Sequence, residues 1–210
     1  VMRNPDILLL DEPFSALDQA KRLELMGVLE QLVKRLNIPV ILVTHRVDEL
    51  MRLADQVIYL NEGQERLNLP LNEALLNPTL AQTLGDEAGV VLTGTVANIV
   101  SDHLMQVDSA MGSIWVRDSG LPPGSRVRLR VLARDVSLSI QEPQESSVQN
   151  RQAGIIESIH PDDHPAQVLV RIQVQQTSVL ARITARALKQ LNLAVGDPVW
   201  VQFKSVAVLL

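Results

Sequence analysis

The sequence contains no cysteine among its 210 residues. Disulfide bonds and cysteine-ligated metal sites are therefore excluded, and the composition fits the cytoplasm. It also has no apolar run near the ~18 residues that a membrane-spanning helix needs, so we expect no membrane span. Polar residues and a proline at positions 3–6 interrupt the first segment, a pattern that does not resemble a secretory signal peptide.

Basic charge is also scarce. Lys and Arg number 19 against 24 Asp and Glu, which gives a net charge of −5. Nucleic-acid-binding domains usually carry a basic surface, so we predict no nucleic-acid partner. Apolar residues make up 46% of the chain, enough for a globular core. The length suits one large domain or two to three small ones.

Residues 1–86 combine short apolar runs with helical patterns. Three runs have the length of β-strands: residues 7–10, 40–43 and 57–60. Continuous apolar runs of this kind suit strands that are buried on both faces of a parallel sheet. Leucines repeat at helical spacing within residues 19–36, and Asp18 is a suitable N-cap for that helix. The alternation of strands and helices predicts an α/β domain.

From residue 87 onward, Val, Ile, Thr and Ser dominate. Short strands are predicted between turns, at residues 93–99, 105–108, 113–116 and 126–132. The segment that begins at Gly94 recurs at Gly154, and residues 121–124 correspond to residues 193–196. We therefore predict two OB-like β-barrels in tandem, one in residues 87–145 and one in residues 146–210.

Two carboxylates, Asp11 and Glu12, directly follow the first apolar run. Ligands of open parallel sheets bind at the carboxyl ends of the strands. Phosphoryl transfer needs a carboxylate that holds Mg²⁺ and a second group that orients or deprotonates the attacking water. An Asp-Glu pair could equally cap the next helix. However, Thr44-His45 ends the next apolar run, so we expect the imidazole of His45 beside the carboxylates.

The segment LLLDEPFSALD (residues 8–18), followed by a helical pattern and VILVTH (residues 40–45), resembles the ATPase subunits of ABC transporters. The resemblance implies that residues 1–86 are the C-terminal half of an ABC-type P-loop NTPase domain. It makes Asp11 the Walker B aspartate that holds Mg²⁺ through water, Glu12 the general base and His45 the switch histidine that contacts the γ-phosphate of ATP.

The same resemblance places Ser15 and Asp18 in the D-loop, which crosses the dimer interface, and makes both candidate nucleotide-binding residues. The family's phosphate loop (GxxxxGK[ST]), glutamine loop and LSGGQ signature do not occur in this sequence. We therefore expect the chain to be a piece of a longer protein and to have no ATPase activity on its own.

Two segments of the second β-domain resemble molybdate-binding domains of the Mop type. Residues 147–156 (SVQNRQAGII) resemble their opening strand, often S-A-R-N-x-x-x-G-x-V, and residues 199–208 (VWVQFKSVAV) resemble their last strand, which contains a Lys-Ser pair. Residues 131–138 also look like the ATPase subunit of molybdate importers. The resemblance therefore implies an ATP-binding subunit of a molybdate (or tungstate) ABC importer.

Candidate oxyanion ligands lie in these two segments: Ser147, Asn150, Lys204 and Ser205. A tetrahedral dianion needs hydroxyl and N–H donors with limited positive charge, which these residue types supply. Each of them could instead be an ordinary strand, turn or solvated residue. Gln149 stands where the family often has Arg.

By this resemblance the protein hydrolyses MgATP as a homodimer on the cytoplasmic face of the cell membrane. Its partners are integral-membrane permease subunits and, indirectly, a periplasmic or extracellular substrate-binding protein. Two alternatives stay open. One is an ABC importer ATPase for sulfate, iron, a sugar or a polyamine, and the other is a non-catalytic oxyanion-binding module formed by this chain alone.

Overall fold

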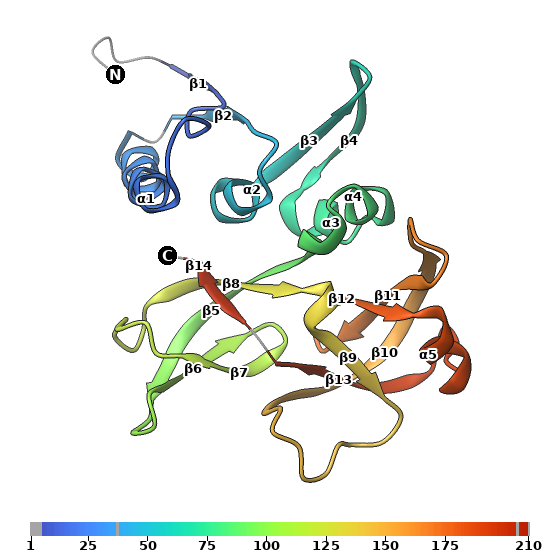
Figure 1. The fold of residues 1–210 in the computed structure, drawn as a ribbon. Coiled ribbons are helices and arrows are strands. Elements are labelled where there is room, and N and C mark those ends of the chain that lie inside the picture. Colours follow the sequence, from blue (N-terminus) through green and yellow to red (C-terminus); the bar gives the residue numbers. More distant parts are fainter. Residues whose placement is uncertain (1–5, 37, 205, 210) are drawn as a thin grey trace. The chain divides into compact units, whose positions relative to one another are not determined.

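A computed structural model describes residues 6–36, 38–204 and 206–209 (Figure 1). Their contacts divide the chain into two compact units, one ending at Asp55 and one running from Gln56 to Leu209. Within these ranges, no helix is long and apolar enough to cross a lipid bilayer.

The first unit contains two strands and two helices: β1 (Leu8–Asp11), α1 (Gln19–Leu36), β2 (Val40–Val43) and α2 (Val47–Leu53). β1 and β2 pair in parallel, with Asp11 opposite Val43. Parallel neighbours need a long crossover connection, and α1 provides it. Asp18 caps α1 as predicted, because its Oδ1 accepts the backbone N–H of Lys21 at 3.0 Å.

The strands of this unit are more exposed than the sequence predicted. β1 and β2 form a two-stranded sheet, and one residue in two along each of them is open to solvent. Leu9 is 67% exposed and Ile41 is 51% exposed. The expectation that both faces are buried is therefore wrong for the strands as the structure describes them.

The third apolar run, residues 57–60, does not join the parallel sheet of β1 and β2. The prediction of a parallel strand is therefore wrong for this run. It forms β3 (Gln56–Asn61), which pairs antiparallel with β4 (Gln64–Pro70). Glu62 and Gly63 connect the two strands with φ values of 52° and 72°. Positive φ at both central residues of a two-residue turn favours a tight hairpin, so the local turn decides the pairing.

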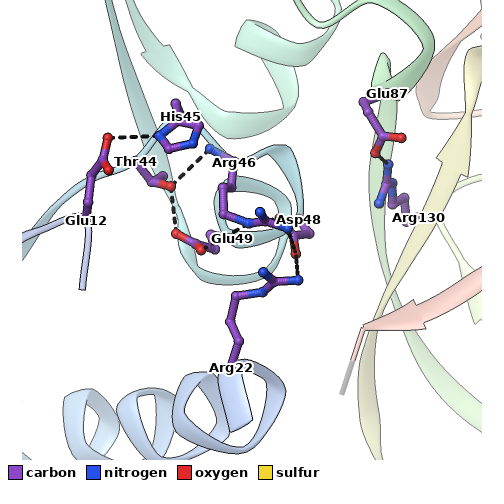
Figure 2. A network of polar contacts seen from close by, with 9 residues as sticks. All are labelled: Glu12, Arg22, Thr44, His45, Arg46, Asp48, Glu49, Glu87 and Arg130. Carbon is purple, nitrogen blue, oxygen red and sulfur yellow. Dashed lines mark hydrogen bonds and ion pairs between the residues drawn. The ribbon is translucent and has the colours of Figure 1, made fainter. Parts of the chain in front are cut away.

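Short helical segments lead from the hairpin to the β-sheets: α3 (Leu71–Leu75), α4 (Pro78–Thr83) and η1 (Gly85–Glu87). Pro78 occupies the start of α4, where a missing N–H costs nothing, and the Asn77 side chain caps that helix. The carboxylate of Glu87 pairs with the guanidinium of Arg130, which ties η1 to the first sheet (Figure 2).

Two five-stranded antiparallel sheets make up the rest of this unit. The first has the order β14-β8-β5-β6-β7, and its strands are β5 (Gly89–Ile99), β6 (Leu104–Ser109), β7 (Gly112–Arg117), β8 (Arg126–Leu132) and β14 (Ala207–Leu209). The second has the order β12-β11-β10-β13-β9, and its strands are β9 (Val136–Ser139), β10 (Asn150–Pro161), β11 (Gln167–Val174), β12 (Thr177–Thr184) and β13 (Pro198–Phe203). η2 (Ala133–Asp135) precedes β9, and α5 (Ala185–Gln190) follows β12. The tandem β architecture predicted from the sequence is confirmed.

Equivalent hydrogen bonds mark the two sheets as repeats of one plan. The carbonyl of Val96 in β5 accepts the N–H of Gly124 at 2.8 Å, and that of Ile156 in β10 accepts the N–H of Gly196 at 2.8 Å. The register of the long strand shifts after Val96 in one sheet and after Ile156 in the other. The repeat inferred from the glycines is therefore present in the structure.

Each sheet takes its fifth, short strand from the sequence segment that supplies the other sheet. β9 comes after β5–β8 in the sequence but pairs with β13 of the second sheet. β14, the last strand in the sequence, pairs with β8 of the first sheet. A single hydrophobic core connects the two sheets, with Met105, Ile114 and Leu129 from one and Leu169 and Val201 from the other. The two sheets are therefore packed around one shared core.

Candidate functional sites

The carboxyl ends of β1 and β2 bring two predicted catalytic side chains together (Figure 2). The backbone N–H of Glu12 donates to the carbonyl of Val43 at 2.9 Å, which extends the parallel pairing by one residue. From this position Glu12 Oε1 lies 2.8 Å from His45 Nδ1. The side chains of Glu12 and His45 are 45% and 69% exposed, so both can reach a ligand from solvent.

Glu12 has an unusual backbone conformation, with φ of 40°. A non-glycine residue in this region costs on the order of 1–3 kcal/mol, and such residues gather at functional sites. The turn is held in part by the N–H of Ser15, which donates to the carbonyl of Glu12 at 3.1 Å. The chain thus turns sharply after β1 and leaves the Glu12 carboxylate at the strand end.

A hydrogen-bonded network fixes the loop that carries His45 (Figure 2). Thr44 Oγ1 donates to Glu49 Oε2 at 2.6 Å and accepts the backbone N–H of Arg46 at 3.0 Å. Glu49 is 1% exposed, and its other oxygen lies 3.4 Å from Arg46 Nε. Arg46 Nε also lies 3.2 Å from Asp48 Oδ1. The backbone on both sides of His45 is therefore anchored to a buried carboxylate.

The other predicted residues of this unit lie in the same turn or just after it. Asp11 is exposed at the end of β1, and Ser15 and Asp18 are exposed in the following segment. No group of three or more metal-ligating His, Cys, Asp or Glu side chains occurs among the described residues. A single carboxylate such as Asp11 still fits Mg²⁺, which usually keeps several waters and takes its other ligands from substrate phosphates.

A hollow of about 270 Å³ lies between the two β-sheets and is lined by three of the four predicted oxyanion residues. These are Ser147, Asn150 and Lys204, while Ser205 lies outside the described residues. The remaining lining residues are Leu104, Trp115, Val116, Arg117, Val148, Gln149, Phe203 and Val206. The contribution of β7 to the hollow was not predicted, because nothing in residues 112–117 resembles a binding motif.

Asn150 makes two backbone hydrogen bonds across the two sheets. Its Oδ1 accepts the N–H of Trp115 at 2.7 Å, and its Nδ2 donates to the carbonyl of Trp115 at 2.9 Å. Asn150 is 7% exposed, whereas Ser147, Gln149 and Lys204 are exposed. The structure therefore uses the Asn150 amide to join β10 to β7.

A larger hollow of about 500 Å³ contains none of the predicted site residues. It lies between the β3–β4 hairpin and α4 and is bordered by Tyr59, Arg66 and Asp163. Its size alone assigns it no chemistry.

Known proteins match both parts of the chain. Residues 146–210 match the TOBE domain. Over 207 residues, 98% of the chain, it is 44% identical to the molybdenum import ATP-binding protein ModC of Methylococcus capsulatus. Over 206 residues it is 41% identical to the protein of the same name from Thiobacillus denitrificans. The chain is a homologue of the molybdenum import ATP-binding proteins.

The resemblance found in the sequence is thereby confirmed along nearly the whole chain. The chain spans 58% of the length of the Methylococcus protein and 57% of that of the Thiobacillus protein. Among solved structures, a molybdate-bound crystal form of the cytoplasmic molybdate-binding protein ModG superposes with a TM-score of 0.49 and 21% identity. That superposition covers 56% of this chain and 93% of the other.

Proposed function

We propose that this chain belongs to the ATP-hydrolysing subunit of an ABC importer for molybdate (or tungstate). The observation that carries the proposal is the 2.8 Å contact between Glu12 and His45 at the ends of two parallel strands, in a chain whose relatives are molybdenum import ATP-binding proteins. On this proposal residues 1–86 are the C-terminal half of the P-loop NTPase domain, and residues 87–145 and 146–210 are its two β-domains.

Glu12 is the general base of this proposed reaction. Its exposed carboxylate takes a proton from the water that attacks the γ-phosphorus of ATP, while the bond from that phosphorus to the β,γ-bridging oxygen breaks and ADP leaves. His45 contacts Glu12 through Nδ1, which leaves Nε2 for the γ-phosphate. Asp11 holds Mg²⁺ through water, and the bound ion supplies positive charge against the phosphates. Ser15 and Asp18 belong to the D-loop at the interface of a homodimer.

The other partners follow from the same proposal. The subunit works with integral-membrane permease subunits, and through them with a periplasmic or extracellular substrate-binding protein, from the cytoplasmic face of the membrane. The hollow lined by Ser147, Asn150 and Lys204 supports an oxyanion-binding role for the β-domains, as a sensor or store of molybdate. It also favours the second candidate, in which this chain alone is a non-catalytic oxyanion-binding module.

The experiment is molybdate uptake in cells that lack the gene for the full-length protein. Cells complemented with the wild-type gene should regain intracellular molybdenum, measured by mass spectrometry, and cells complemented with the Glu12→Gln gene should not. If the wild type restores uptake of sulfate, iron, a sugar or a polyamine and leaves molybdenum unchanged, the cargo assignment is wrong.

A further inference from the structure

We infer that Arg117 is an anion-contacting residue of the hollow between the two β-sheets, and that Asn150 positions the strand that carries it. The inference rests on the proposed oxyanion-binding function and adds to it a ligand from the first β-repeat. No motif in the sequence assigns a role to Arg117.

The charge of the lining selects an anion. Among the described residues that line the hollow, the charged ones are Arg117 and Lys204, and none is Asp or Glu. The chain as a whole carries a net charge of −5, so a hollow whose charged lining residues are both cations differs from the average surface. Gln149 is neutral and adds no charge where the family often has Arg. Arg117 therefore supplies the second positive charge, beside that of Lys204, that balances a dianion.

Arg117 can also supply geometry that Lys204 lacks. A guanidinium presents several N–H donors in a planar fork and binds two oxygens of one oxyanion at once, while an ammonium acts as a compact point charge. The apolar side chains of Trp115 and Phe203 line the same hollow. Apolar walls lower the local dielectric constant and strengthen charge-assisted hydrogen bonds.

The position of Arg117 depends on an edge strand. β7 lies at the edge of its sheet, next to β6. In the part of the chain that the structure describes, β7 has no strand of its own sheet on its outer side to bond the N–H and the carbonyl of Trp115. The side-chain amide of Asn150 forms hydrogen bonds with both groups, at 2.7 and 2.9 Å. Residues two apart on a strand share a face, so a clamp at Trp115 fixes the direction from which Arg117 approaches the hollow.

In this arrangement Asn150 positions β7, whereas the sequence predicted that Asn150 binds the anion directly. Both ends of its amide are committed to Trp115. Its second Nδ2 hydrogen still allows a contact, but the chief anion donors in this arrangement are Arg117, Lys204 and the hydroxyl of Ser147. The site is thus built from both β-repeats.

The test is isothermal titration calorimetry of the full-length protein with sodium molybdate. Arg117→Gln should weaken binding about tenfold or more and reduce its dependence on salt, because one charge contact is lost. Arg117→Lys should recover part of the affinity. Arg126→Gln, which removes an exposed arginine of β8 outside the hollow, is the matched control and should bind as the wild type does.

Two outcomes overturn the inference, and they differ in what else they remove. If the wild type binds molybdate and Arg117→Gln binds equally well, Arg117 has no role, while the proposed oxyanion function stands. If the wild type gives no molybdate heat at all, the oxyanion function of the β-domains falls together with the inference.

Discussion

At the scale of single residues, two side chains that lie 33 positions apart in the sequence meet in the fold. Glu12 and His45 meet because β1 and β2 run in parallel and end together. The sequence predicted this meeting, because each residue lies two positions after the end of an apolar run. It did not predict the buried Glu49 below Thr44, since an acidic residue early in a helix has an ordinary explanation in the helix dipole.

The Thr44–Glu49 bond gives a prediction for the loop that carries His45. Thr44→Val keeps the side-chain volume but leaves the buried Glu49 carboxylate without its hydroxyl donor, which costs about 1–3 kcal/mol. Local opening should therefore increase, and amide hydrogen exchange in residues 44–53 of the full-length protein should speed up about 5- to 150-fold. Gln31→Ala, on the exposed side of α1, should leave this exchange unchanged. Unchanged exchange in Thr44→Val would show that the bond does not hold the loop.

At the scale of elements, strand positions in the β region were predictable and strand partners were not. Residues 126–132 form β8 as expected, because alternating apolar residues and flanking turns are local signals. The pairing of β9 with β13 and of β14 with β8 depends on contacts between distant segments, which a local pattern does not encode. The hairpin of β3 and β4 was missed because a continuous apolar run cannot distinguish parallel from antiparallel pairing.

The glycine in β10 yields a prediction at this scale. A Cβ added to Gly154 would lie 2.7 Å from the carbonyl oxygen of Gln173 and 2.7 Å from Ile172 Cγ2. Gly154→Ala must therefore displace β11, at a cost of about 1–3 kcal/mol, and the thermal unfolding temperature of the full-length protein should fall. Ala153→Ser adds one atom to the exposed neighbouring position and should change stability by about 0.5 kcal/mol or less. Equal unfolding temperatures for both variants would contradict the close approach of β10 and β11.

At the scale of the whole molecule, the sequence predicted two kinds of domain, and the tandem β architecture is present. The role assigned to each site residue stays a prediction.

Within the second unit, Arg182 on β12 holds the helical segment to the sheet. Its guanidinium pairs with Asp162 at 2.5 Å and donates to the carbonyls of Gly85 and Ala81. Composition gave no indication of this contact, because an arginine in a strand is usually solvated.

Arg182→Met tests how far this ion pair supports the second unit. The side chains of Arg182 and Asp162 are 4% and 3% exposed, so removing one partner leaves a buried charge and should cost about 3–5 kcal/mol. Arg171→Met breaks a pair with Glu157 whose side chains are 40% and 32% exposed, and should cost about 1 kcal/mol or less. Urea denaturation of the full-length protein measures both. A similar small loss in the two variants would mean that the buried pair contributes little.

Replacing Glu12 tests whether this residue is the base of the proposed ATP hydrolysis reaction. ATP binding and steady-state ATP hydrolysis are measured on the purified full-length protein and its Glu12→Gln variant, together with the permease. Glutamine keeps the size of the side chain but cannot accept the proton, so binding should persist while kcat falls about 10²- to 10⁴-fold. A variant that hydrolyses ATP at nearly the wild-type rate would contradict the account.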